Sequence, residues 1–200
     1  MDRGGGLPAA TFPAGDAMTS LYRAALDDLG RVFDRIDDAA VSRAVAEIAA
    51  ARRIALYGVG REGLQIKGFA MRLFHLGRQV AMVGDMTTPP VGAGDLLIVS
   101  AGPGGFSTVD ALLGVARGAG ARTLLVTAQP GGSAAKLADT LLPIPARTMA
   151  DDSGPAVSVL PMGSLFEGAQ YILFEIMILH LRERLGVTPE AMRANHTNLE

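Results

Sequence analysis

A glycine-spaced turn is the stretch of this sequence best suited to chemistry. Residues 58–63 read Gly-Val-Gly-Arg-Glu-Gly, after the apolar run Ile54–Tyr57 and before apolar residues at helical intervals. Glycines let a backbone approach a ligand closely, and the first amides of a helix have no intrahelical partners. The turn therefore predicts an anion-binding site with a phosphate as its ligand. The same spacing also occurs in turns that bind a dinucleotide and in turns that bind no ligand. The candidate residues here are Gly58, Gly60, Arg61 and Lys67, of which Lys67 is explained equally well as part of a solvated helix face.

A second glycine-rich loop follows the strand expected at Asp95–Ser100. It reads Ala-Gly-Pro-Gly-Gly-Phe-Ser-Thr over residues 101–108, and its proline has no amide hydrogen to donate. Because the carboxyl ends of parallel strands meet at one edge of a sheet, both loops could face one ligand. This loop adds the candidate binding residues Ser100, Gly102, Gly104, Gly105, Ser107 and Thr108.

Two side chains are candidates for proton transfer. Glu167 lies near the start of the mostly apolar helix expected at Met162–Leu185, where burial would raise the pKa of its carboxyl and the helix terminus would lower it. It could act as a base, or it could only stabilise the helix dipole. His196 lies in a polar tail, where a histidine is more often solvated than catalytic. His75 and His180 have apolar neighbours on helices and are expected to be structural.

Composition limits the classes of function. The chain has 200 residues, 49% of them hydrophobic and 19% charged, which suits one sizeable core and excludes a disordered protein. A net charge of −2, without basic clusters, indicates no nucleic-acid or anionic membrane partner. Without cysteine, and with three dispersed histidines, the sequence offers no metal pattern. Since the first 16 residues lack a secretion signal and Leu165–Leu181 is interrupted by polar residues, we expect a cytoplasmic protein.

Hydrophobic periodicity predicts an alternating α/β domain. Helices are expected at Thr19–Ile36, Asp38–Ala51, Ser107–Ala119, Ser133–Asp139 and Met162–Leu185, together with one after the glycine turn and a short one at Pro189. Strands are expected at Ile54–Tyr57, Gln79–Val83, Asp95–Ser100, Arg122–Thr127 and Thr140–Ile144. This alternation predicts a parallel sheet with helices on both faces. Residues 1–18 are expected as a flexible tail, residues 19–200 as one domain, and Pro145–Pro161 as a mobile loop over the site.

Several motifs resemble, in order and spacing, those of one known family. They are GVGREG, KGFAMRLFHLG, GDLLIVS, AKLAD, PMGSLFE and LGVTPEAMRANHTNLE, within about Ala40 to Glu200. In these motifs the chain resembles the 6-phospho-3-hexuloisomerases, a family of sugar isomerase (SIS) domain proteins. The resemblance implies a flavodoxin-like three-layer αβα sandwich with a five-stranded parallel sheet, in a homotetramer or alternatively a dimer. It also implies interconversion of 3-hexulose 6-phosphate and fructose 6-phosphate in the ribulose monophosphate pathway, through an enediolate, with no cofactor and no metal.

The resemblance also assigns roles to individual residues. Glu167, in PMGSLFE, would be the base. His196, in the C-terminal motif, would transfer protons at the sugar oxygens or during ring opening, from across a subunit boundary. Arg61 and Lys67 match positions that hold the phosphate or a sugar oxygen.

The chain departs from the family pattern in both loops. The family's second loop reads like SGSGETSS, so this chain lacks both early serines and the Glu-Thr pair, while Glu62 adds a negative charge where the family tends to have serine. Losing several charge-assisted hydrogen bonds of about 1.5–3 kcal/mol each could abolish phosphate affinity unless Arg61 or a rearranged loop compensates. Two alternatives therefore stay open: an isomerase with a changed substrate, and a non-catalytic sugar-phosphate-binding protein.

A nucleotide-binding oxidoreductase is a third alternative. Asp85 follows Gly60 by about 25 residues, roughly where an acid holds the ribose in a dinucleotide-binding unit. The chain is short for that class, however, and has no separate substrate domain. We expect Asp85 instead to cap or brace the Thr87–Pro90 loop.

Overall fold

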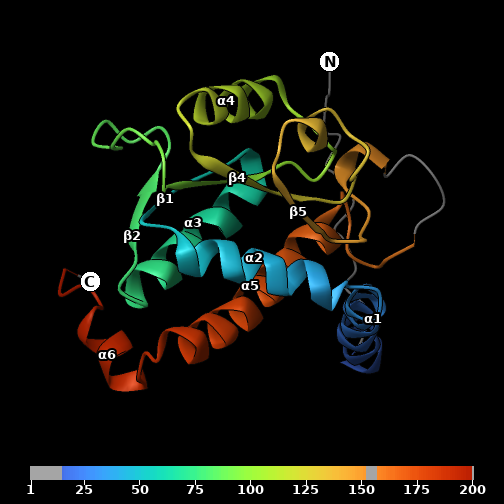
Figure 1. Ribbon diagram of the computed structural model, residues 1–200. Helices are drawn as coiled ribbons and strands as arrows, with labels where there is room; N and C mark the ends of the chain where they lie inside the picture. The colour runs from blue at the N-terminus through green and yellow to red at the C-terminus, as the bar shows by residue number, and fades with distance from the viewer. Residues whose placement is uncertain (1–14, 152–156, 200) are drawn as a thin grey trace, which may run out of the picture.

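The computed structural model describes residues 15–151 and 157–199, and its middle layer is a parallel sheet of five strands (Figure 1). The strands are β1 (Arg53–Gly58), β2 (Gln79–Met82), β3 (Leu96–Ser100), β4 (Arg122–Thr127) and β5 (Thr140–Pro143). They pair in the order β2-β1-β3-β4-β5. Gly58 at the end of β1 pairs with Ser100 at the end of β3, so the two glycine-rich loops leave the sheet side by side. The predicted five-stranded parallel sheet is confirmed.

Helices cover both faces of this sheet. They are α1 (Gly15–Phe33), α2 (Asp38–Ala50), α3 (Gly60–His75), α4 (Ser107–Gly118), α5 (Ser164–Leu185) and α6 (Pro189–Ala194), with short 3-10 turns at Ala134–Lys136 and Met149–Asp151. Figure 1 shows α2, α3 and α5 on one face and α4 on the other. Leu96 and Ile98 of β3 lie in the core under α2, α3 and α5, whereas Leu97 and Val99 lie in the core under α4. Successive side chains of a strand point to opposite faces, which explains the fully buried β3.

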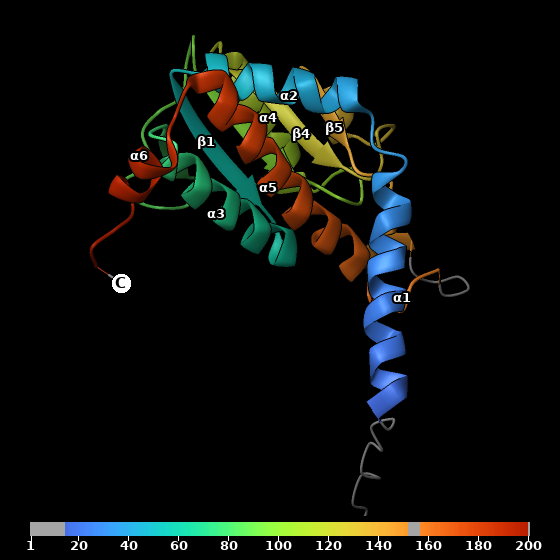
Figure 2. The same cartoon turned by 90° about the horizontal axis from the view of Figure 1, so that it is seen from below.

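Helix α1 extends away from the body of the molecule (Figure 2). It begins at Gly15, earlier than the helix start expected at Thr19, and residues 1–14 of the expected tail lie outside the described residues. Asp28 of α1 is 5% exposed and accepts hydrogen bonds from Ser158 Oγ at 2.6 Å and from the amide of Val159 at 2.9 Å. Helix α1 therefore holds the segment that leads into α5. Of the expected mobile loop, residues 152–156 lie outside the described residues.

Helix α5 is the central apolar helix of the domain. Phe174 stacks on Phe69 of α3 with ring centroids 4.2 Å apart, and Ala169 and Met177 are fully buried. Within the described part of the chain, α5 alone is long and apolar enough to cross a membrane, by length and composition only, and 50% of its most apolar window is buried inside the protein. Packing against α3 and the sheet accounts for its composition.

Candidate active site

The turn between β1 and α3 packs the end of the strand against the start of the helix. Gly60 has a φ of 57°, in the left-handed region that glycine adopts with least strain. A Cβ atom on Gly63 would lie 2.5 Å from the carbonyl oxygen of Gly58, so a larger residue there would push the helix off the strand. This geometry places Arg61 and Glu62 at the carboxyl edge of the sheet.

Glu62 is buried at this edge, with only 6% of its surface exposed. Its Oε2 accepts hydrogen bonds from Ser100 Oγ at 2.6 Å and from the amide of Gly102 at 2.8 Å. Ser100 Oγ in turn accepts a hydrogen bond from Gln170 Nε2 at 2.9 Å. Burial raises the pKa of Glu62, and this effect outweighs the two hydrogen bonds, which favour its charged form. Glu62 therefore ties the first loop to the second.

Arg61 reaches across to the start of α5. Its Nη2 lies 3.3 Å from Glu167 Oε1 and donates to the carbonyl of Met162, while its Nη1 donates to Ser164 Oγ at 2.9 Å. Met162 and Gly163 both have left-handed φ angles, 53° and 74°. This bend starts α5 so that Glu167 faces Arg61.

Glu167 combines burial with an unpartnered oxygen. Its side chain is 14% exposed, and its Oε2 is buried and finds no hydrogen-bond partner among the described residues. Burial raises the pKa of Glu167, and the nearby charge of Arg61 offsets part of this rise. A carboxyl group with a raised pKa is better matched to proton transfer near neutral pH. The geometry is that of a candidate general base.

The loop after β3 offers an anion fewer amides than the sequence indicated. The amide of Gly102 donates to Glu62, and that of Gly104 donates to the carbonyl of Ala101 at 2.9 Å. No side chain of the described chain caps α4, so the first amides of this helix, at Ser107 and Thr108, stay open to a ligand. Ser107 and Thr108 are both exposed residues.

Two sequence-predicted residues lie away from this cluster within one chain. Lys67 is exposed on α3, and no hydrogen bond or ion pair joins it to residues 15–151 or 157–199. The ring of His196 stacks on that of His75, at the last residue of α3, with centroids 5.0 Å apart. Figure 2 shows α6, which precedes His196, and the start of α5, which carries Glu167, at opposite ends of the molecule. The structure thus groups Arg61 with Glu167, and His75 with His196.

Sequence reasoning missed two polar residues of the site, Ser164 and Gln170. Both lie on α5 at helical spacing from Glu167, and Gln170 is fully buried with its Oε1 unpartnered in the described structure. A glutamine inside an apolar helix was the available signal, because buried amides almost always have partners. Asp85, considered above for a ribose, accepts hydrogen bonds from Thr88 through its backbone carbonyl, as expected of a loop brace.

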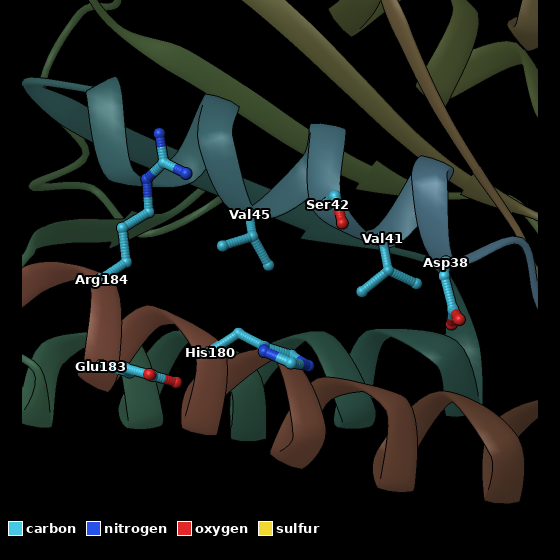
Figure 3. A pocket seen from close by; sticks show the side chains of 7 residues that line it. All are labelled: Asp38, Val41, Ser42, Val45, His180, Glu183 and Arg184. Atoms are coloured by element: carbon cyan, nitrogen blue, oxygen red, sulfur yellow. The ribbon is translucent and has the colours of Figure 1, made fainter.

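A separate groove of about 590 Å³ lies between α2 and α5 (Figure 3). Its walls are formed by Asp38, Val41, Ser42 and Val45 of α2 and by His180, Glu183 and Arg184 of α5. None of the residues predicted for catalysis or phosphate binding lines it. The groove is therefore distinct from the candidate active site.

Comparison with known proteins identifies relatives over most of the chain. A family model described as SIS domain matches residues 47–169. The chain is 35% identical to the 3-hexulose-6-phosphate isomerase of Mycobacterium gastri over 186 residues, covering 93% of each chain. It is 38% identical to the 3-hexulose-6-phosphate isomerase of Methylomonas aminofaciens over 151 residues, covering 76% of this chain and 82% of that one. A solved structure of a hypothetical protein from Methanococcus jannaschii, for which a molecular function of 3-hexulose-6-phosphate isomerase was inferred, matches with a TM-score of 0.75 at 26% identity, over 93% of this chain and 100% of the other.

Proposed function

The chain belongs to the SIS domain family, which also contains the 3-hexulose-6-phosphate isomerases, and we propose that it interconverts 3-hexulose 6-phosphate and fructose 6-phosphate. One observation carries the proposal. The Glu167 carboxylate lies beside the Arg61 guanidinium, and its buried Oε2 has no hydrogen-bond partner among the described residues. A base that takes a proton from carbon needs such an oxygen, and a neighbouring cation stabilises the oxyanion that forms.

The reaction moves a carbonyl group between two adjacent carbons. Glu167 removes the proton on C2 of the 3-ketose, the electron pair moves toward the C3 carbonyl, and an enediolate forms. Arg61 stabilises its negative charge. Return of the proton to C3, with transfer of a proton from the C2 oxygen to the C3 oxygen, gives the C2 ketone of fructose 6-phosphate. Atoms and electrons balance without a redox partner.

The phosphate is bound at the start of α4. The amides of Ser107 and Thr108 and their hydroxyls supply donors there, and the helix dipole favours an anion. Gly105 lies two residues before Ser107 and can add its amide to this site. The Gly102 amide takes no part in this site, because Glu62 already accepts its hydrogen bond.

The functional unit is a homo-oligomer, a tetramer or a dimer, in which His196 enters the site of a neighbouring subunit. The support is twofold. His196 lies at the far end of α3 from Glu167 in its own chain. The outer faces of α3 and α5 also expose large apolar side chains, a pattern typical of subunit contacts: Leu64, Met71, Phe74, Tyr171 and Leu179. A phosphorylated substrate and a chain without cysteine fit the cytoplasm.

A coupled assay tests the proposal. A separate synthase forms 3-hexulose 6-phosphate from formaldehyde and ribulose 5-phosphate, and fructose 6-phosphate is the detected product. We expect turnover by the wild type and a loss of about 10²–10⁴-fold in Glu167→Gln, the range for removal of a general base. Glu175→Gln, on the same helix in an ion pair with Arg72, is the matched control and should keep its activity.

The non-catalytic alternative predicts a different result. It is motivated by the Gly102 amide, which is already engaged, and by the absence of hydroxyl side chains from residues 101–106. A folded wild-type protein that binds fructose 6-phosphate but shows no turnover would refute the isomerase and establish a sugar-phosphate-binding protein. If the protein turns over a different ketose phosphate and not 3-hexulose 6-phosphate, it is an isomerase with a changed substrate.

A further inference from the structure

The Glu62 carboxylate accepts hydrogen bonds from the donors at the end of β3 that could otherwise bind an anion. Its Oε2 accepts hydrogen bonds from Ser100 Oγ, at 2.6 Å, and from the Gly102 amide, at 2.8 Å. A Cβ atom on Gly102 would lie 2.9 Å from Glu62 Oε1, so the carboxylate fits against this glycine with little room to move. The Glu62 carboxylate is therefore the anion bound by these donors at the end of β3.

The charge of Glu62 has no ion-pair partner among the described residues. Arg61, the neighbouring cation, forms its ion pair with Glu167 and donates its other hydrogen bonds to Met162 and Ser164. Glu62 lies in the first turn of α3, where the helix dipole favours a carboxylate. The end of the site between β1 and β3 is therefore negative, while the open amides of α4 form its anion-binding end.

We propose that Glu62 is a specificity-determining residue that admits sugar monophosphates and rejects sugars carrying a second phosphate near the reacting carbons. The proposal rests on the proposed function, because the 6-phosphate held at α4 directs the carbonyl end of the sugar to Glu167 and Arg61. Glu62 lies beside those two residues, and its pKa responds to the charges of both. A phosphate on C1 would meet a buried like charge and find the Gly102 amide already engaged.

The experiment is a calorimetric titration that needs no turnover. Wild type, Glu62→Gln and Glu62→Ser are titrated with fructose 6-phosphate and with fructose 1,6-bisphosphate. Glutamine can still accept both hydrogen bonds through its amide oxygen, and serine gives a second neutral variant if glutamine disturbs the loop. We expect the wild type to prefer the monophosphate by about tenfold or more. Both neutral variants should bind the bisphosphate about tenfold more tightly than the wild type does, while their monophosphate affinity changes less than about threefold.

Glu190→Gln is the control for a loss of net charge, since Glu190 is exposed on α6. It should keep the wild-type preference. Equal bisphosphate affinity in the wild type and both neutral variants, or no bisphosphate binding to either variant, would overturn the inference. A wild type that keeps the preference for the monophosphate but turns over no ketose phosphate would refute the proposed isomerase and leave the role of Glu62 standing.

Discussion

Replacement of Arg61 by methionine should shift the acid side of the pH–activity profile to higher pH. Methionine keeps much of the side-chain length and removes the charge that lies 3.3 Å from Glu167. A positive neighbour favours the ionised carboxylate, and the base must be ionised to act, so loss of Arg61 raises the pKa of Glu167 and the pH below which activity falls.

The size of the shift follows from the exposure of the pair. Two unit charges about 4 Å apart at an effective dielectric constant near 20 interact by about 4 kcal/mol. The Arg61 side chain is 43% exposed, and solvent screening reduces the interaction to about 1 kcal/mol. The acid limb should move toward higher pH by an amount that corresponds to this reduced interaction energy. The plateau of kcat/KM should also fall about 10²–10³-fold, because the oxyanion loses a positioned donor.

The assay is the rate of fructose 6-phosphate formation measured across pH for the wild type and the variant. Arg72→Met is the matched control, since Arg72 forms an ion pair between the same two helices, 3.0 Å from Glu175. It should leave the acid limb in place. If the acid limb of the pH–activity profile does not move in folded Arg61→Met, Glu167 is not the base whose pKa Arg61 lowers.

Two further predictions concern stability. Asp95→Ala should lower the free energy of unfolding by about 3 kcal/mol in chemical denaturation, because the buried Asp95 accepts two hydrogen bonds from Arg52 and one from the amide of Gly92. These hydrogen bonds hold the pKa of Asp95 below its ordinary value of 3.8. The difference in the free energy of unfolding between the wild type and Asp95→Ala should therefore be complete above that pH and disappear as pH falls through the lowered pKa. A difference that persists in strong acid would contradict this cause. Gly163→Ala should destabilise the protein by more than about 2 kcal/mol and reduce activity, since its Cβ would lie 2.3 Å from the backbone nitrogen of Met149 and 2.6 Å from the carbonyl carbon of Thr148. Gly186→Ala, with a similar φ and open space around it, should cost about 1 kcal/mol. Equal losses in the two glycine variants would exclude the clash.

The architecture was largely predictable from the sequence. Each of the five strands lies within a residue or two of its predicted range, because a parallel sheet covered on both faces needs short continuous apolar runs. The start of α3 followed from the glycine spacing, since Gly60 needs a left-handed φ and Gly58 and Gly63 touch. Such signals are local, so one sequence is enough to recognise them.

The arrangement of the site was only partly predictable. The sequence marked Arg61 as a candidate phosphate ligand and Glu167 as the candidate base, and treated Glu62 as an added negative charge near the anion. The structure instead shows Glu62 buried and bonded to the second loop, with Gln170 completing the network. Loop chemistry alone could not show this, because the Gly102 amide serves an external phosphate or an internal carboxylate equally well.

Local sequence patterns were enough to predict the succession of strands and helices along the chain, the two glycine loops at one edge and the candidate base on α5. The pairing of each charge with its hydrogen-bond donor depends instead on how the whole chain packs. Glu62 meets Ser100 across 38 residues of sequence, and Arg61 meets Ser164 across 103. These contacts depend on the pairing of β1 with β3 and on the packing of α3 against α5, and both are set by burial of the whole core rather than by any local pattern.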